Sequence, residues 1–227
     1  CQIAGETIDY GPCAFMDAFA SDRVFSSIDR MGRYSYANQP DIAIWNMAQL
    51  ATSLVPLMPD AESAVERFTT MLHEMKDHLR VEWLAVFAEK LGISQPDIED
   101  GTLIADLLDL METGGSDFTN TFAALNHGSA IDEITDRVAY NAWHNRWSAR
   151  IKDEENPKAL MARRNPVIIP RNHRIEQMIT AAVEGDFVPF HRLNAAHQTP
   201  FEDREDIDDL KRPPSTEEIV PATFCGT

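Results

Sequence analysis

Apolar residues recur every three or four positions from Gln39 to about His197, which is the spacing of amphipathic helices. Pro40 suits the first turn of the first such helix, and Pro56 and Pro59 end it. Apolar residues lie on both of its sides, so we expect this helix to be largely buried; they are Ile42, Trp45, Ala48, Ala51 and Val55 on one side and Ile44, Met47, Leu50 and Leu54 on the other.

The second predicted helix is the longest. Asp60 can cap its start and Gly92 can end it, and a helix of over 30 residues is expected to be bent or broken. Its apolar stripe consists of Val65, Phe68, Leu72, Met75, Leu79 and Val86.

Shorter helices follow. Ser94 and Asp97 imitate a capping box, the residue pair that begins a helix, and the helix that they would begin ends at Gly114-Gly115. Its buried face is Leu103, Ile104, Leu107, Leu108 and Met111. We predict further helices at 117–125, 131–151, 175–184 and 187–197, a helical turn at Pro157, and an extended stretch at 165–170, where prolines exclude helix. The predicted fold class is therefore mainly α, with little β.

The sequence divides into three parts. Residues 1–38 are irregular, residues 39–200 form the helical body, and residues 201–227 form an acidic and C-terminal tail. The tail is strongly acidic from Glu202 to Asp209, and we expect this stretch to be solvated and poorly packed. The apolar stretch 219–225 is expected to dock onto the body.

The net charge of −17, from 20 basic and 37 acidic residues, argues against nucleic-acid or membrane partners. It fits a solvated acidic surface, or a partner protein with a basic patch. Three cysteines do not make a disulfide framework and fit a cytoplasmic location. The sequence contains no apolar run of the roughly 18–20 residues that span a bilayer, and its first residues do not resemble a signal peptide.

One carboxylate near the start, Asp9, has an unusual local context. A β-prone run ends at Ile8, and Gly11 and Pro12 favour a tight turn directly after Asp9. A metal-binding aspartate on such a turn is typical of the kinase Asp-Phe-Gly signature, of which Asp-Tyr-Gly is a variant. Taken alone, the tripeptide fits an ordinary β-turn better, so the surrounding sequence has to decide.

That surrounding sequence closely resembles the selenoprotein O family. The run Gly-Glu-Thr-Ile-Asp-Tyr-Gly-Pro-Cys-Ala-Phe-Met-Asp-Ala-Phe at 5–19 carries the resemblance. Further matches are at 32–40, 44–46, 90–92, 165–166, 169–173, 184–187 and 225–227, all in one register. The resemblance implies the C-terminal part of a protein-kinase-like C-lobe, of the pseudokinase kind, with a helical extension. It also implies transfer of AMP from ATP to Ser, Thr or Tyr hydroxyls of proteins.

The resemblance assigns a role to Asp9, the aspartate that holds Mg²⁺ (or Mn²⁺) on ATP. The asparagine that shares this metal, the catalytic aspartate and the phosphate-binding lysine are expected upstream of Cys1, and no catalytic residue is assigned within this sequence. Cys1-Gln2 depart from the residues that usually follow that asparagine in the family. No Gly-rich phosphate loop is found here, so this piece alone is expected to be inactive.

The resemblance also singles out two cysteines. Family members carry cysteine or selenocysteine at the extreme C-terminus, so Cys225 is a candidate redox residue. Some members pair it with a cysteine at the position that Phe25 occupies here. Cys13 is the nearby alternative, and a Cys13–Cys225 bridge would tie the tail over the active cleft. Cys13 can equally be a small buried apolar residue.

Several other features have two interpretations. The irregular region 1–38 corresponds to a kinase activation segment, or else is a surface loop held by its aromatic residues. Arg163, Arg164 and Arg171 could meet phosphates or the acidic tail, although structural salt bridges or solvent exposure are favoured. His73-Glu74 and His78 miss the metalloprotease spacing by one residue, so a solvated helix surface is favoured.

We therefore predict the C-terminal part of a protein AMP-transferase that uses ATP and a divalent metal ion and acts on protein substrates. A non-catalytic helical module, which binds a partner protein or regulates the catalytic half, is the alternative.

Overall fold

The computed structural model describes residues 14–223, and these residues are almost entirely helical or irregular. The one β-type contact among them is an isolated bridge between Ala18 and Asp117. The mainly α fold class is thus confirmed. The α-helices are α1 (Gln39–Leu54), α2 (Ala61–Lys90), α3 (Asp100–Gly114), α4 (Phe118–His127), α5 (Arg137–Arg150), α6 (Pro157–Arg164), α7 (Asn172–Val183), α8 (Val188–His197) and α9 (Asp208–Lys211). Short 3₁₀ helices are η1 (Tyr36–Asn38), η2 (Val55–Leu57), η3 (Ala130–Asp132) and η4 (Glu205–Ile207).

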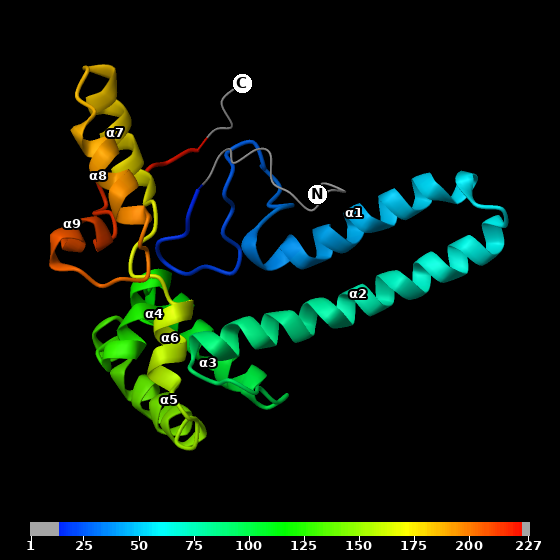
Figure 1. Cartoon of the computed structure of the whole chain (residues 1–227), viewed down its shortest axis with the longest axis horizontal. Helices are drawn as coiled ribbons and strands as arrows, with labels where there is room; N and C mark the ends of the chain where they lie inside the picture. The colour runs from blue at the N-terminus through cyan, green and yellow to red at the C-terminus, as the bar shows by residue number, and fades with distance from the viewer. Residues whose placement is uncertain (1–13, 224–227) are drawn as a thin grey trace.

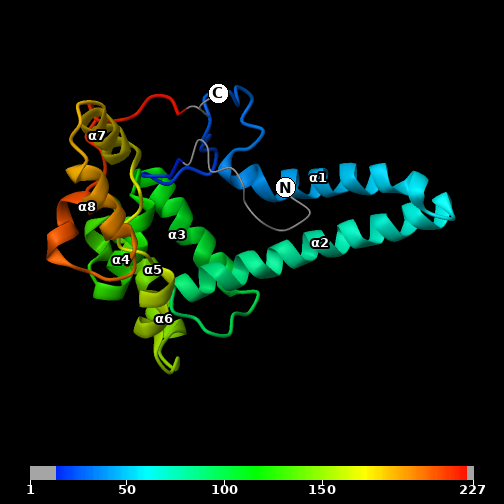
Figure 2. The ribbon, with the colours of Figure 1, turned by 45° about the horizontal axis from the view of Figure 1, so that its top comes forward.

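Helices α1 and α2 form a long arm that projects from a body made by the other helices (Figure 1, Figure 2). The expectation that the first helix is largely buried is wrong, because no residue of α1 is buried. A helix in an arm packs chiefly on one neighbour, here α2, so its second apolar side stays partly open. On the side of α1 that carries Trp45, the guanidinium of Arg33 lies over the indole, 4.3 Å from its ring centre.

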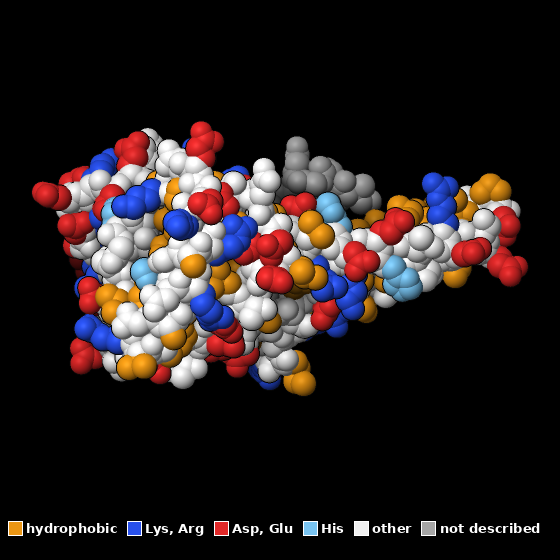
Figure 3. Space-filling model, turned by 90° about the horizontal axis from the view of Figure 1, so that it is seen from below, with side chains coloured by type: hydrophobic (Ala, Val, Ile, Leu, Met, Phe, Trp, Pro, Cys, Tyr) orange, Lys and Arg blue, Asp and Glu red, His pale blue; other side chains and the backbone are white. Residues whose placement is uncertain are grey.

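Charged and apolar side chains alternate along the arm. Seen from below, hydrophobic side chains lie between acidic and basic ones, without a continuous apolar band (Figure 3). Val65, Met71 and Val81 are all more than half exposed. Within residues 14–223, no helix combines the length with the apolar composition that a membrane span requires.

Helix α2 runs unbroken for 30 residues. Its predicted cap is confirmed, because the side chain of Asp60 accepts hydrogen bonds from the backbone N–H groups of Glu62 and Ser63. The predicted capping box after it is wrong, since α3 begins only at Asp100. Ser94 Oγ instead donates to the Glu154 carboxylate at 2.6 Å.

The main core joins the end of α2 to α3, α4, α5 and α6. Two tryptophans of α5 connect these helices: Trp143 Nε1 donates to the Leu103 carbonyl and Trp147 Nε1 to the Leu91 carbonyl, both at 2.8 Å. The predicted apolar face of α3 is confirmed as buried. Helix α5, however, begins at Arg137 and not near Ile131, because Asp136 caps it after the separate turn η3.

A second, smaller core lies under α8 and α9, formed by Val167, Ile168, Leu193, Ala196, Ile207 and Leu210. The sequence predicted that the acidic stretch 202–209 is poorly packed, and this part of the prediction is wrong. Ile207 is buried, and the Asp209 carboxylate accepts two hydrogen bonds from Arg192. Basic side chains of α8 and α9 pair with these acidic residues. A count of the charges along the sequence does not reveal this pairing.

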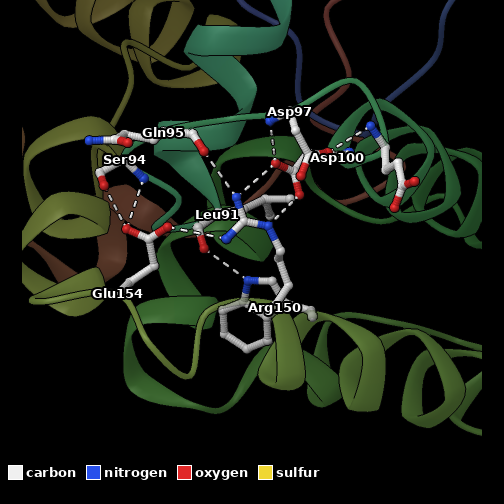
Figure 4. Close-up of polar contacts among 9 residues, drawn as sticks. Leu91, Ser94, Gln95, Asp97, Asp100, Arg150 and Glu154 are labelled. Atoms are coloured by element: carbon white, nitrogen blue, oxygen red, sulfur yellow. Dashed lines mark hydrogen bonds and ion pairs between the residues drawn. The ribbon is translucent and has the colours of Figure 1, made fainter.

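A polar cluster around Arg150 holds the loop between α2 and α3 against α5 (Figure 4). Arg150 donates to both carboxylate oxygens of Asp100, at 2.8 and 3.0 Å, to Glu154 at 3.2 Å and to the carbonyl of Gln95 at 3.0 Å. Asp100 is 3% exposed. A buried carboxylate needs such a partner, since its desolvation is otherwise costly.

Gly92, at the end of α2, is predicted to resist substitution. Its φ is +82°, and a Cβ there would lie 2.9 Å from Pro157 Cβ. Strain at positive φ and the clash together should lower the free energy of unfolding of Gly92→Ala by roughly 2–3 kcal/mol in urea titrations. Gly115 is the control, because its φ is +65° but a Cβ there meets no described atom within 4 Å. Gly115→Ala should cost only about 1 kcal/mol; equal losses would contradict the packing at Gly92.

Candidate functional site

The three residues predicted from the sequence as site residues, Asp9, Cys13 and Cys225, lie outside the described residues. The parts of the chain that adjoin them are described. Ala14 and Thr223 both line one cleft of about 770 Å³. The two ends of the described chain, which adjoin the metal and redox candidates, therefore border the same space.

This cleft is built from segments far apart in sequence. Its walls are the segment 14–29, the turn after α3, the turn after η3, the first residues of α7 and the C-terminal stretch 213–223. Figure 1 and Figure 2 both draw the C-terminal stretch (red) reaching from α9 toward the N-terminal segment (blue). The lining carries the carboxylates of Asp17, Asp29, Asp117, Asp132, Glu133 and Glu218.

Beneath the cleft, Arg171 connects three elements. Its Nη1 donates to Asp17 Oδ1 at 2.5 Å and to Asp117 Oδ2 at 2.7 Å, and its Nη2 donates to Asp117 Oδ1 at 3.2 Å and to Asn120 Oδ1 at 3.0 Å. Arg171 is 1% exposed. We call Arg171, Asp17, Asp117 and Asn120 the Arg171 cluster. Burial lowers the pKa of Arg171, but its hydrogen bonds to Asp117 and Asp17 outweigh burial and raise it overall, so it stays charged.

The backbone reinforces this cluster. Phe118 N donates to the Asp17 carbonyl at 2.8 Å, and Phe19 N donates to the Ser116 carbonyl at 2.9 Å. Met16 and Phe19 are buried in the main core. Asp117 also caps α4, because its Oδ1 accepts from Asn120 N at 2.8 Å. The chain is therefore fixed at residues 16–19, a few positions after Asp9.

The C-terminal stretch is held against residues 25–27. The Ser27 backbone N–H and Oγ both donate to the Thr223 carbonyl, at 3.2 and 2.8 Å, and Thr223 Oγ1 donates to the Phe25 carbonyl at 2.6 Å. Docking of the tail onto the body, predicted from its apolar residues, is thus confirmed as far as Thr223. It docks at the position where some members of the resembled family carry a second cysteine.

Two ionisable groups of the cleft are perturbed. Burial raises the pKa of Glu133, and the nearby charge of Asp117 raises it further. Burial, followed by the charge of Arg174, lowers the pKa of His173. His173 is 3% exposed and neither ring nitrogen has a hydrogen-bond partner among the described residues. Because its lining has six carboxyl groups and, among the described residues, one Arg or Lys side chain, Arg23, the cleft carries more acidic than basic groups.

A second cavity of about 810 Å³ shares Ala14 and Phe15 with the first cleft. Its lining is mainly aromatic and apolar, and includes Tyr36, Phe118 and Ile169 together with Lys90. The Lys90 ammonium lies 4.7 Å from the ring centre of Phe122 and donates to the Arg164 carbonyl at 3.3 Å. Burial lowers the pKa of Lys90 to about 8.

The lowered pKa of Lys90 predicts a pH-dependent stability. Between about pH 8 and the pKa of an unfolded lysine, near ~10.4, the unfolded chain binds a proton that the folded chain has released. The free energy of unfolding should therefore rise with pH in this window. Urea titrations at about pH 7 and 9.5 should show wild type gaining roughly 1–2 kcal/mol relative to Lys90→Met, which cannot titrate. If the free energy of unfolding changed equally in the two proteins between these pH values, the burial of the Lys90 ammonium would be contradicted.

The remaining candidates from the sequence have mainly structural surroundings. Arg171 lies in the buried ion-pair cluster, and Arg164 pairs with Glu89 at 2.7 Å. His78 lies beside Glu82 on the exposed surface of α2. Within residues 14–223, no group of three or more His, Cys, Asp or Glu side chains could hold a metal ion.

Sequence reasoning considered Arg171 but missed Asp17 and Asp117 as its partners. The 54 positions that separate Asp117 from Arg171 leave no periodic signal. Lys90 was noted only as part of a matching stretch. The loss of its solvation depends on Phe118 and Phe122, which a different helix supplies.

Comparison with known proteins agrees with the sequence-based resemblance. The family model described as "Protein adenylyltransferase SelO" matches residues 1–198. "Protein nucleotidyltransferase YdiU" from Ruegeria sp. (strain TM1040) is 56% identical over 226 residues, which is 100% of this chain and 48% of that protein. The protein of the same name from Roseobacter denitrificans is 53% identical over 225 residues, 99% of this chain and 47% of that protein. The chain spans about half the length of the curated relatives it matches. It belongs to the SelO family of protein adenylyltransferases.

Proposed function

We propose that this chain is the C-terminal part of a protein nucleotidyltransferase that transfers AMP from ATP to Ser, Thr or Tyr hydroxyls of other proteins. The observation that carries this proposal is the family match over residues 1–198, which includes the Asp-Tyr-Gly motif at 9–11. The printed names of the relatives, protein nucleotidyltransferases, support the reaction class. We use "intact protein" below for a protein of the relatives' length that contains this chain.

The proposed reaction is a displacement at the α-phosphorus of ATP. The acceptor hydroxyl oxygen forms a bond to this phosphorus, the bond from it to the bridging oxygen breaks, and pyrophosphate leaves. The hydroxyl proton passes to a base that we expect outside this chain. A divalent ion, Mg²⁺ or Mn²⁺, would neutralise part of the phosphate charge when bound.

Asp9 is the residue of this chain that we propose as ligand for that ion. A carboxylate suits a hard cation of this kind, which one or two protein carboxylates and phosphate oxygens usually hold together. The chain alone should bind nucleotide weakly, because the phosphate-binding lysine and the second metal ligand are expected elsewhere.

We retain a Cys13–Cys225 bridge and a cytoplasmic location as parts of the proposal. The shared cleft at Ala14 and Thr223 supports the former.

The position of a radioactive label distinguishes AMP transfer from phosphorylation. The intact protein should incorporate label into protein from ATP labelled at the α-phosphate and none from ATP labelled at the γ-phosphate. The isolated chain of 227 residues should incorporate neither. Label from the γ-phosphate would identify a kinase, and label from the α-phosphate with the isolated chain would place the whole active site within these residues.

A further inference from the structure

We propose that the cavity beside Lys90 binds a small molecule with an aromatic or aliphatic body and one acidic group, and that the Lys90 ammonium holds this group. We call this space the Lys90 cavity. Every contact used below lies within residues 14–223, and the inference does not depend on AMP transfer.

The Lys90 cavity has the size and the lining of a small-molecule site. Its volume is about 810 Å³, within the range of roughly 300–1,000 Å³ for such sites. Aromatic and aliphatic side chains from distant parts of the chain form most of its wall, among them Phe15, Met16, Tyr34, Tyr36, Phe118 and Ile169. A ligand with an apolar body would lose contact with water against this wall, which favours binding.

Lys90 is the one Lys or Arg side chain among the described lining residues. Its ammonium donates to the Arg164 carbonyl at 3.3 Å and lies 5.6 and 4.7 Å from the ring centres of Phe118 and Phe122. No carboxylate of residues 14–223 forms an ion pair with it. An ammonium has three N–H groups, so two of them have no acceptor among the described residues.

The carboxylates nearest to Lys90 in the sequence and in the lining are engaged elsewhere. Glu89 pairs with the Arg164 guanidinium at 2.7 Å. Asp29, the carboxylate of the described lining, accepts from the backbone N–H groups of Arg33 and Tyr34, at 2.9 and 2.8 Å, one on each oxygen. The positive charge of Lys90 therefore has no complement in this part of the chain.

An anionic group from outside would supply that complement. Burial lowers the pKa of Lys90 to about 8, so the side chain is still mostly protonated at pH 7. A partly desolvated ammonium gains from a hydrogen-bonded anion, because such bonds are stronger than those between neutral groups. One ammonium matches one acidic group, and the net charge of −17 disfavours a polyanion.

Fluorescence titration of the intact protein with anilinonaphthalenesulfonate tests the role of the charge. This probe has fused aromatic rings and one sulfonate, and phenylnaphthylamine has the same rings without the sulfonate. A non-hydrolysable ATP analogue with Mg²⁺ is added first, so that neither probe reports on a nucleotide site. Lys90→Met should weaken binding of the sulfonate by roughly 10- to 100-fold, the loss expected for a hydrogen bond to a charged group.

Two controls accompany this variant. Binding of phenylnaphthylamine should be the same in wild type and Lys90→Met, because methionine keeps an apolar side chain of similar length. Lys158→Met removes the same charge from α6, where Lys158 is exposed and does not line the Lys90 cavity. It should leave the affinity for both probes unchanged.

Acetylation by acetic anhydride gives a second measurement, which needs no variant. Saturating anilinonaphthalenesulfonate should slow acetylation of Lys90 severalfold in wild type, as measured by mass spectrometry, and leave that of Lys158 unchanged.

Three results would overturn the inference. The first is equal affinity of wild type and Lys90→Met for the sulfonate, and the second is acetylation of Lys90 that the sulfonate does not slow. The third is binding by the isolated chain but not by the intact protein, which would show that another part of the intact protein fills the Lys90 cavity.

Discussion

Replacing Asp9 by alanine should lower AMP transfer by the intact protein by ~100- to 1,000-fold, the usual cost of removing one group that stabilises charge at the reacting phosphate. The variant would lose the carboxylate proposed to hold the ion on ATP. Its folding should be unaffected, because the core residues that fix this part of the chain, Met16 and Phe19, remain. The measurement is incorporation of α-phosphate label at saturating ATP.

Asp22→Ala is the matched control for this prediction. Asp22 is exposed, lies in the same N-terminal segment, and makes no hydrogen bond or ion pair with the described residues. The substitution is chemically identical and removes the same charge from the same region. Full activity of Asp22→Ala beside inactive Asp9→Ala would support the assignment, whereas label that persists in Asp9→Ala would remove this residue from the mechanism.

Replacing Trp143 by alanine should lower the free energy of unfolding by about 3–5 kcal/mol, the range for a large aromatic residue removed from a core. Trp143 is 1% exposed and stacks on Trp147 at 5.6 Å with an interplanar angle of 9°. Its indole N–H also satisfies a carbonyl of α3. The substitution therefore removes both packing and the connection between α3 and α5.

Chemical denaturation of the isolated chain tests this prediction. Val138→Ala in the same helix is the control, because Val138 is 83% exposed and the change should alter stability little. Trp143→Phe should fall between the two, since it retains an aromatic ring but leaves the hydrogen bond to Leu103 unmade. A loss for Trp143→Ala as small as that for Val138→Ala would contradict the central place of α5 in the core.

Local signals predicted the helical elements well. Prolines and glycines marked many of the ends, as at Pro40, Gly92 and Gly115, and Asp60 capped α2 as expected. These signals act within a few residues along the chain, so the sequence reveals them directly. The apolar face of α3 was also predicted, because its periodicity is that of a helix buried on one side.

Predictions that depended on tertiary neighbours were less successful. Apolar residues on two sides of α1 predicted burial, but the arm gives this helix only one main neighbour. The acidic stretch predicted a solvated and poorly packed segment; its acidic side chains are exposed, but Arg192 and Lys211 pair with two of them and the segment is packed. Ser94 satisfied a capping pattern, yet its hydroxyl donates a hydrogen bond to Glu154, which lies 60 positions away. Each of these outcomes depends on a residue that local reading does not place nearby.

The candidate site shows the same difference between local sequence signals and contacts that only the tertiary fold creates. The sequence singles out Asp9 as a candidate, through a turn pattern and a family resemblance, because that motif is contiguous. It could not identify the Arg171 cluster, whose members come from the N-terminal segment, the start of α4 and the residue before α7. Only the fold brings these four side chains together.

Direct measurement of the bound ion tests the central claim about Asp9. Electron paramagnetic resonance can follow the uptake of Mn²⁺ by the intact protein in the presence of a non-hydrolysable ATP analogue. Wild type should bind the ion, and Asp9→Asn should bind it at least ~10-fold more weakly, since an amide oxygen carries no charge to offset that of the cation. Equal Mn²⁺ affinity in the two proteins would show that this carboxylate holds no metal and would contradict the proposed function of the segment.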